Sequence, residues 1–213
     1  MKLYGYWRSS ASYRVRIALA LKGIEAEYIA VNLREGEHFS PSHAKRNAQP
    51  FVPVLELEDG TKLTQSTAII EYLDAEYGQA ALLPADPVLR AQVRAAASII
   101  SADIAPIQNL RVLKYIRAEY EQDDAGVKSW AAHWIRESFK ALEQIASSND
   151  KPFLLTDTPS LAECCLIPQI YNARRFGVDM DDFPVLKQID ERCLGLTAFQ
   201  KALPETQPDA PEG

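Results

Sequence analysis

The sequence predicts two parts, a thioredoxin-like α/β domain over residues 1–82 and an all-helical domain over residues 88–213. Three observations lead to this prediction. Short strand-like runs alternate with helical patterns only up to residue 78. The segment LLPADP at residues 82–87 contains two prolines and marks a linker. From residue 88 onward the apolar spacing is helical throughout.

The first strands and the helix between them follow from local patterns. Lys2–Tyr6 and Glu27–Val31 have the composition of short strands. Between them, residues 10–23 place apolar side chains on one helical face and end at Gly23, a favoured helix stop. The polar, irregular segment at residues 34–50 leaves room for a short helix.

A hairpin and a second helix complete the α/β part. VPVLELEDGTKLTQS predicts two strands joined at Asp59-Gly60, a strong hairpin signal. We expect Ser66 to cap a helix that ends near Gly78. The order β-α-β-(α)-β-β-α gives a thioredoxin-like layer, with the first two strands parallel and joined by a right-handed crossover. In that layer Val52-Pro53 is the place for a cis-proline.

The helical part carries two further signals. Pro106 predicts a kink in the helical stretch that starts at residue 88. Ser160 and Glu163 form a capping box at the start of an apolar helix. We expect the tail PETQPDAPEG, residues 204–213, to be loosely held.

Composition restricts the class of protein. The formal net charge of −6 argues against a nucleic-acid binder, because such proteins usually carry a basic surplus. No apolar run approaches the ~20 residues that span a bilayer, and no signal peptide is recognisable, so we expect a cytoplasmic protein without membrane contact. Cys164, Cys165 and Cys193 lack metal-ligand spacing, which favours reduced core thiols and no metal site.

The turn after the first strand is the main candidate site. Thioredoxin-like redox proteins have Cys-x-x-Cys there, but this chain has Arg8-Ser9-Ser10-Ala11-Ser12 and no cysteine before residue 164, which excludes disulfide exchange. A helix N-terminus with a serine hydroxyl favours a thiolate supplied from outside. A simpler alternative is that Ser9 or Ser10 only caps the helix.

A second helix N-terminus strengthens the functional alternative. Gln65-Ser66 follows the hairpin directly and adds two hydrogen-bonding side chains. Two helix N-termini that converge beside Val52-Pro53 predict a site for a peptide anion.

The segments RSSASYRVRIALALKG, VPVLELEDG, LTQSTAIIEYLD, IQNLRVLKY and YNARRFGVD resemble the zeta class of glutathione transferases, the family that includes the maleylacetoacetate isomerases. The resemblance spans essentially the whole chain. It implies a glutathione transferase fold, glutathione as cofactor and a homodimer in which the first domain of one chain meets the helices of the other. It also implies that the helical domain forms the substrate cleft.

The resemblance assigns roles to individual residues. Ser9 matches the serine that stabilises the thiolate, and Ser10 is its catalytic neighbour. The implied glutathione-binding residues are Ser9, Ser10, Ala11, Ser12, Tyr13, Arg14, His38, Val52, Pro53, Gln65, Ser66, Asn109, Leu110 and Arg111. Arg8 and Arg175 match arginines that meet substrate carboxylates. For Arg16 we expect a salt-bridged surface position, and for Arg174 a solvated helix face.

Three departures from the family pattern stand out. Many relatives have cysteine where this chain has Ala11, and Phe51 and Ala105 are apolar at positions that are often polar. Ala11 does not undermine isomerisation, because that reaction needs only the glutathione sulfur. Because Phe51 and Ala105 depart from the family pattern, the resemblance does not assign the contacts near Val52 or one contact in the cleft.

The implied activity is glutathione-dependent cis–trans isomerisation of maleylacetoacetate, a small dicarboxylate, to fumarylacetoacetate in tyrosine and phenylalanine breakdown. The alternatives are isomerisation of maleylpyruvate, conjugation of glutathione to α-halo acids, and non-enzymatic glutathione binding. The intact Ser9, Gln65 and Ser66 argue against the last of these.

Overall fold

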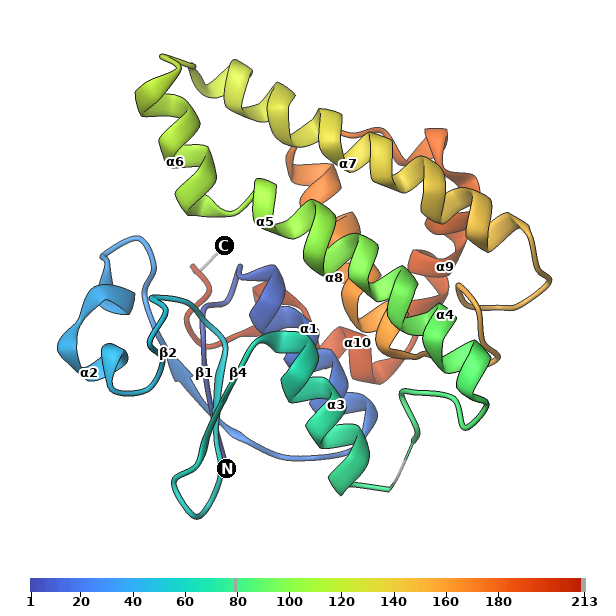
Figure 1. Cartoon of the computed structure of the whole chain (residues 1–213), viewed down its shortest axis with the longest axis horizontal. Helices are drawn as coiled ribbons and strands as arrows, with labels where there is room; N and C mark the ends of the chain where they lie inside the picture. The colour runs from blue at the N-terminus through green and yellow to red at the C-terminus, as the bar shows by residue number, and fades with distance from the viewer. Residues whose placement is uncertain (79, 212–213) are drawn as a thin grey trace. The chain divides into compact units, whose positions relative to one another are not determined.

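The computed structural model describes residues 1–78 and 80–211, which belong to two compact units (Figure 1). Unit 1 consists of Met1–Leu83 together with Leu194–Gly213, and unit 2 of Pro84–Cys193. Unit 1 therefore includes the end of the chain, whereas the sequence had placed residues 194–213 with the helical domain.

Unit 1 contains the four strands of the chain's one described sheet. Its elements are β1 (Lys2–Gly5), α1 (Ser10–Leu21), β2 (Glu27–Ala30), the 3-10 turn η1 (Glu37–Phe39), α2 (Pro41–Ala44), β3 (Val54–Glu56), β4 (Lys62–Thr64), α3 (Ser66–Glu76), α10 (Thr197–Ala202) and the 3-10 turn η4 (Pro204–Thr206). These bounds confirm every strand and both main helices predicted for residues 2–78 to within a few residues.

The sheet has the strand order β2-β1-β3-β4. β1 and β2 are parallel, and β3 is antiparallel to both β1 and β4, which confirms the thioredoxin-like layer. α1 and α3 pack together on one face, and α2 lies on the other side of the strands (Figure 1). The core between the sheet and the helices is apolar. It includes Leu3, Ile17 and Leu55, each of which is at most 2% exposed.

The turns follow the predicted chemistry. Gly23 ends α1 at φ +64 and Gly60 closes the hairpin at φ +84, values that only glycine adopts without strain. The Val52-Pro53 peptide bond is cis, as predicted. The predicted cap of α3 is wrong by one residue: Ser66 is the first helical residue, and Gln65 is the N-cap.

The tail is not loose over its described part, contrary to prediction. α10 packs on α1, and η4 follows it directly. Beyond η4, Asp209 Oδ2 accepts a hydrogen bond of 2.9 Å from the Trp7 backbone N–H and one of 3.4 Å from the Tyr28 hydroxyl. A carboxylate that satisfies a backbone donor 202 residues away holds the tail in place.

Unit 2 is helical. Its elements are α4 (Pro87–Ser98), the π-helical η2 (Ile99–Ile104), α5 (Ala105–Ile107), α6 (Leu110–Glu119), α7 (Asp124–Ser147), α8 (Leu161–Arg175), the 3-10 turn η3 (Met180–Asp182) and α9 (Pro184–Leu194). The irregularity predicted at Pro106 is present as the π-helical stretch just before it, since proline has no N–H with which to continue the α-helical ladder.

The predicted capping box at α8 is confirmed. The Glu163 carboxylate accepts hydrogen bonds of 2.8 Å from the Ser160 N–H, 2.7 Å from the Ser160 hydroxyl and 2.8 Å from the Leu154 N–H. Burial raises the pKa of Glu163, and the three donors oppose that rise.

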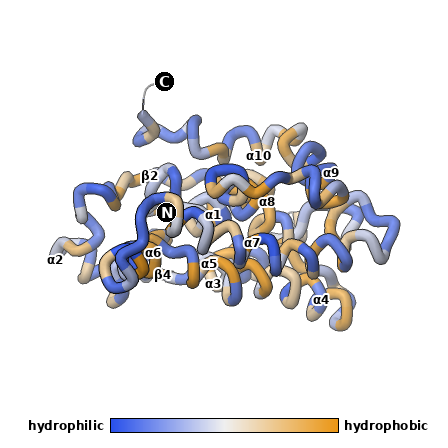
Figure 2. The backbone as a smooth tube through the Cα atoms, turned by 90° about the horizontal axis from the view of Figure 1, so that it is seen from above, coloured by the Kyte–Doolittle hydropathy of each residue, from blue (hydrophilic) through white to orange (hydrophobic). Residues whose placement is uncertain are grey.

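Hydrophilic and hydrophobic residues alternate along the helices (Figure 2), and no helix in the described residues is long and apolar enough to cross a membrane.

Candidate functional site

Three segments meet at one end of the sheet in unit 1. The ladder aligns Tyr4 with Val54 and Val54 with Thr64, so the end of β1, the start of β3 and the end of β4 are adjacent. The β1–α1 turn, the cis Val52-Pro53 bond and the start of α3 follow or precede these positions directly. The convergence expected from the sequence is therefore confirmed.

Ser9 is the N-cap of α1. Its Oγ accepts a hydrogen bond of 3.2 Å from the Ser12 N–H, while its side chain stays partly exposed. Ser10 is the first helical residue and is also partly exposed. A capping hydroxyl uses a lone pair, not its proton. Ser9 can therefore cap α1 and still donate a hydrogen bond to an anion, so the two alternatives weighed for it are compatible.

The rest of the serine run faces inward. Ala11 is half-buried, whereas Ser12 and Tyr13 are at most 1% exposed. The Ser12 hydroxyl accepts a hydrogen bond of 3.4 Å from the Tyr6 N–H and so fixes the end of β1. Ser12 and Tyr13 thus shape the turn from within.

Two residues that the sequence analysis missed support the segment before the cis-proline. His43 Nε2 and Asn47 Nδ2 both donate to the Phe51 carbonyl oxygen, at 2.9 and 3.0 Å. His43 is 1% exposed and Asn47 is 8% exposed. The sequence offered one pointer to this role, namely that two polar side chains four residues apart come shortly before Val52-Pro53.

The start of α3 has an open N-terminus. Gln65 adopts φ +67, and its side chain makes no capping bond but donates to Gln49 Oε1 at 2.9 Å. Ser66 is 6% exposed, and its Oγ accepts a 3.3 Å hydrogen bond from Arg14 Nη1. This bond joins α1 to α3 beneath the two helix N-termini.

Arginines surround the β1–α1 turn. The Arg8 guanidinium stacks 5.4 Å from the centroid of the Trp7 ring. The prediction for Arg16 is wrong: it is 6% exposed and donates to the carbonyl oxygens of Trp7 (3.0 Å) and Ala202 (3.1 Å). Burial lowers the pKa of Arg16. Arg16 is a structural link between the turn and α10.

The remaining predicted residue of unit 1 is His38. It lies in η1, is 8% exposed and stacks on Phe39 with 4.0 Å between ring centroids.

Unit 2 contains the other predicted residues. Asn109 caps α6, with its Oδ1 accepting from the Arg111 N–H at 3.2 Å, and Leu110 is 44% exposed. Arg175 Nη1 donates to Asn172 Oδ1 at 2.9 Å at the end of α8. Its neighbour Arg174 is not simply solvated as expected, because it pairs with the buried Asp190 at 2.6 Å.

Comparison with known proteins identifies the family. Residues 1–75 match the family model of the glutathione S-transferase N-terminal domain. Maleylacetoacetate isomerase from Pseudomonas aeruginosa is 43% identical over 99% of this chain and 99% of its own length. The structure of a maleylpyruvate isomerase, described as a bacterial zeta-class glutathione S-transferase, is similar with a TM-score of 0.96 and 44% identity over 99% of this chain and 100% of that one.

The chain belongs to the zeta class of the glutathione transferases.

A further relative was solved with a bound ligand. The maleylacetoacetate isomerase of Anaeromyxobacter dehalogenans, with a TM-score of 0.89 and 45% identity over 99% of this chain and 97% of that one, was solved with glutathione in its active site. In this zeta-class transferase the first cysteine is residue 164, so the β1–α1 turn offers hydroxyls in place of thiols.

Proposed function

We propose that this transferase is a glutathione-dependent isomerase that converts maleylacetoacetate to fumarylacetoacetate, in the breakdown of tyrosine and phenylalanine. The observation that carries the proposal is Ser9, whose hydroxyl caps α1 and keeps its proton for an incoming anion. Full-length identity of 43% to a maleylacetoacetate isomerase supports the choice of substrate.

The residues of unit 1 fit glutathione. The N-terminus of α3 has no side-chain cap, and the exposed faces of Ser9 and Ser10 lie at the same end of the sheet. Helix N-termini favour anionic groups. The proposed glutathione-binding set is the one expected from the sequence, with Ser9 and Ser10 facing the sulfur, Val52 the cysteinyl backbone, and Gln65 and Ser66 the γ-glutamyl group.

Glutathione, when bound, supplies a thiolate that adds reversibly to a conjugated double bond and so permits rotation about it. The protein's part is to favour the thiolate. Ser9 donates a hydrogen bond to the sulfur, and the positive end of α1 lowers the pKa of the thiol. Arg8 and Arg175 are the proposed partners of substrate carboxylates, and Arg8 could equally stabilise the negative charge that develops on the carbonyl oxygen.

The test is an assay of purified protein on maleylacetoacetate with and without glutathione. Turnover that requires glutathione but does not consume it supports isomerisation. Stoichiometric loss of glutathione would instead indicate conjugation of α-halo acids or other electrophiles. Ser9→Ala should lower kcat/KM about ten- to hundredfold, because a hydrogen bond to an ionised group contributes about 1.5–3 kcal/mol. Unchanged activity of Ser9→Ala would remove the role assigned to Ser9.

Maleylpyruvate is the second candidate substrate. A maleylpyruvate isomerase matches this chain with a TM-score of 0.96, and maleylpyruvate is also a dianion that two arginines would suit. Parallel kinetics on both compounds decide between them, since the true substrate should have the higher kcat/KM.

We also propose that the protein is a cytoplasmic homodimer. Cys164, Cys165 and Cys193 are buried and form no disulfide bond, which suits a reducing compartment. Sedimentation equilibrium of the full chain tests the assembly, and a monomer at micromolar concentration would contradict the proposal.

A further inference from the structure

The β1–α1 turn is held by side chains that come from outside it. The turn is closed by a hydrogen bond of 2.9 Å from the Ser9 N–H to the Tyr6 carbonyl oxygen, which makes Trp7 and Arg8 the central residues of a β-turn. That closing bond does not use the N–H or the C=O of Trp7. Because backbone groups in a folded protein are normally paired, both groups of Trp7 need partners from elsewhere.

The two partners of Trp7 are charged side chains. Asp209 Oδ2, in the C-terminal tail, accepts from the Trp7 N–H at 2.9 Å. Arg16 Nη2, in α1, donates to the Trp7 carbonyl oxygen at 3.0 Å. Hydrogen bonds with one ionised partner are stronger than neutral ones. Asp209 and Arg16 therefore clamp the backbone of the turn.

The tail meets this clamp at two points. Arg16 Nε also donates to the carbonyl oxygen of Ala202, the last residue of α10, at 3.1 Å. Further along the same tail, Asp209 Oδ2 accepts a second bond of 3.4 Å from the Tyr28 hydroxyl. Burial lowers the pKa of Arg16, while Tyr28 and Asp209 act in the opposite direction, so the three side chains form one cluster. A displacement of the tail would thus reach Trp7 through both Arg16 and Asp209.

Trp7 in turn supports the residues proposed for the chemistry. Ser9 follows two residues later, its N–H closes the turn, and its Oγ accepts from the Ser12 N–H at 3.2 Å. The Arg8 guanidinium stacks 5.4 Å from the centroid of the Trp7 ring. A shift of Trp7 would therefore move the hydroxyl that is proposed to meet the sulfur. Displacements of about 1 Å are enough to impair a reacting geometry.

We propose that Asp209 and Arg16 are positioning residues, which clamp the Trp7 backbone and so hold the Ser9 hydroxyl where it meets the glutathione sulfur. The inference rests on the proposed glutathione dependence and adds the C-terminal tail to that site. Both residues act through Trp7. A tail that only stabilised the fold would leave the bound thiol unchanged as long as the protein is folded.

The test measures the pKa of the glutathione thiol bound to the full-length protein, from the ultraviolet absorbance of the thiolate as pH is varied. Asp209→Ala should raise this pKa by about one unit above the wild-type value, because Ser9 is no longer held in place to donate to the sulfur. Asp209→Asn should resemble wild type. Oδ2 accepts both bonds of Asp209, and Oδ1 has no hydrogen-bond partner among the described residues, so one amide oxygen can preserve both bonds.

Glu143→Ala is the matched control. Glu143 is likewise a carboxylate that accepts from distant backbone N–H groups, those of Val185 and Leu186, both at 2.9 Å, but it belongs to unit 2. Its loss should lower the melting temperature, as the loss of Asp209 should, and leave the thiol pKa unchanged. An equal rise of the thiol pKa in Glu143→Ala and Asp209→Ala would reveal a general effect of destabilisation and would overturn the inference.

Other outcomes separate the inference from the proposed function. A folded Asp209→Ala protein with the wild-type thiol pKa overturns the inference alone, and so does an Asp209→Asn protein as impaired as Asp209→Ala. If Asp209→Ala does not fold, Arg16→Lys takes its place, because lysine keeps the charge but lacks the fork that bridges Trp7 and Ala202. A wild-type pKa in Arg16→Lys then overturns the inference. A wild-type protein that does not bind glutathione overturns the proposed function together with it.

Discussion

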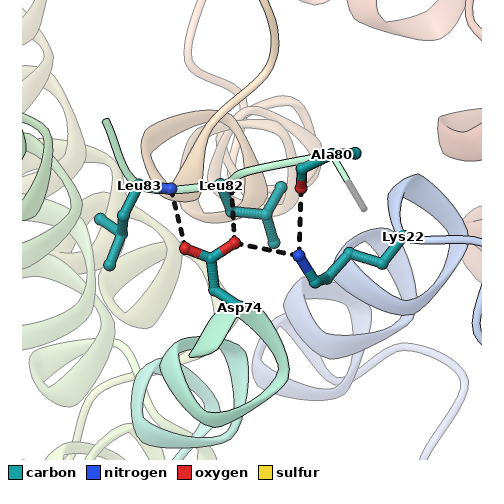
Figure 3. Close-up of polar contacts among 5 residues, drawn as sticks. All are labelled: Lys22, Asp74, Ala80, Leu82 and Leu83. Atoms are coloured by element: carbon teal, nitrogen blue, oxygen red, sulfur yellow. Dashed lines mark hydrogen bonds and ion pairs between the residues drawn. The ribbon is translucent and has the colours of Figure 1, made fainter. Parts of the chain in front are cut away.

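Lys22 and Asp74 form a buried ion pair that ties the ends of α1 and α3 to the segment leaving unit 1 (Figure 3). Lys22 Nζ lies 3.0 Å from Asp74 Oδ1 and 3.1 Å from the Ala80 carbonyl oxygen. The same carboxylate accepts from the Leu82 N–H at 2.7 Å and the Leu83 N–H at 3.1 Å. One acidic side chain therefore anchors three donors, two of them on the backbone.

Removing either partner should destabilise the protein unequally. Lys22→Met leaves Asp74 with two backbone donors, whereas Asp74→Ala leaves two N–H groups without their acceptor and the buried Lys22 ammonium without its counter-ion. We expect a loss of about 3–5 kcal/mol in the free energy of unfolding for Asp74→Ala and a smaller loss for Lys22→Met. Urea denaturation followed by circular dichroism measures both. Equal losses would show that the backbone bonds contribute little.

The link from the tail to the β1–α1 turn is the second target. Asp209→Ala removes the acceptor of the Trp7 N–H, so we expect a loss of about 1–2 kcal/mol in unfolding free energy and a shift in tryptophan fluorescence. Asp181→Ala is the control, because Asp181 forms an exposed pair with Lys187 in unit 2 and its loss should leave the melting temperature nearly unchanged. If the tail contributed nothing to stability, Asp209→Ala and Asp181→Ala would have the same free energy of unfolding.

The sequence predicted this architecture where the signals are local. Glycine at a positive φ, the Asp59-Gly60 hairpin and the Ser160–Glu163 box each act within a few residues of chain, and each is confirmed. The four-stranded layer then follows from the order of the elements. The position of the candidate site, where two helix starts lie at the same end of the sheet as a Val-Pro pair, was likewise predictable.

Burial of the arginines was not predictable from periodicity. Arg14 and Arg16 are two residues apart and so point in different directions from α1, which normally indicates that at least one is solvated. Both are buried because α3 covers one side of α1 and α10 the other. Arg16 bonds to Ala202, 186 residues away, and no local pattern reports such a contact. His43 and Asn47 were missed for a related reason, since their common partner is a backbone carbonyl oxygen.

The three thiols should be inert in the native protein. Cys164, Cys165 and Cys193 are fully buried, and burial raises the pKa of Cys193. We expect essentially no reaction with Ellman's reagent at pH 7 or 8.5, and three reactive thiols in denaturant. Fast reaction of one thiol in the folded state would contradict the buried positions.

The raised pKa of the Cys193 thiol also predicts the direction in which stability changes with pH. The folded state holds the thiol proton more tightly than the unfolded state, so this contribution to stability is complete below the unfolded value of about 8.5 and is lost as pH rises above it. Cys193→Ala should flatten the fall in melting temperature between pH 8 and 10. An identical slope in both proteins would assign the fall to other groups.

The anchor of the Phe51 carbonyl oxygen gives the last prediction. His43 and Asn47 donate to the same oxygen, so either one alone keeps it satisfied. We expect His43→Ala or Asn47→Ala to weaken glutathione binding only a few-fold, and the double variant to weaken it by more than the product of the two, because only then does the Phe51 carbonyl oxygen lose both of these donors. Calorimetric Kd values for the four proteins of the cycle measure this coupling. Strictly multiplicative effects would mean that the two donors act independently, and that the carbonyl oxygen does not set the position of Val52 for its ligand.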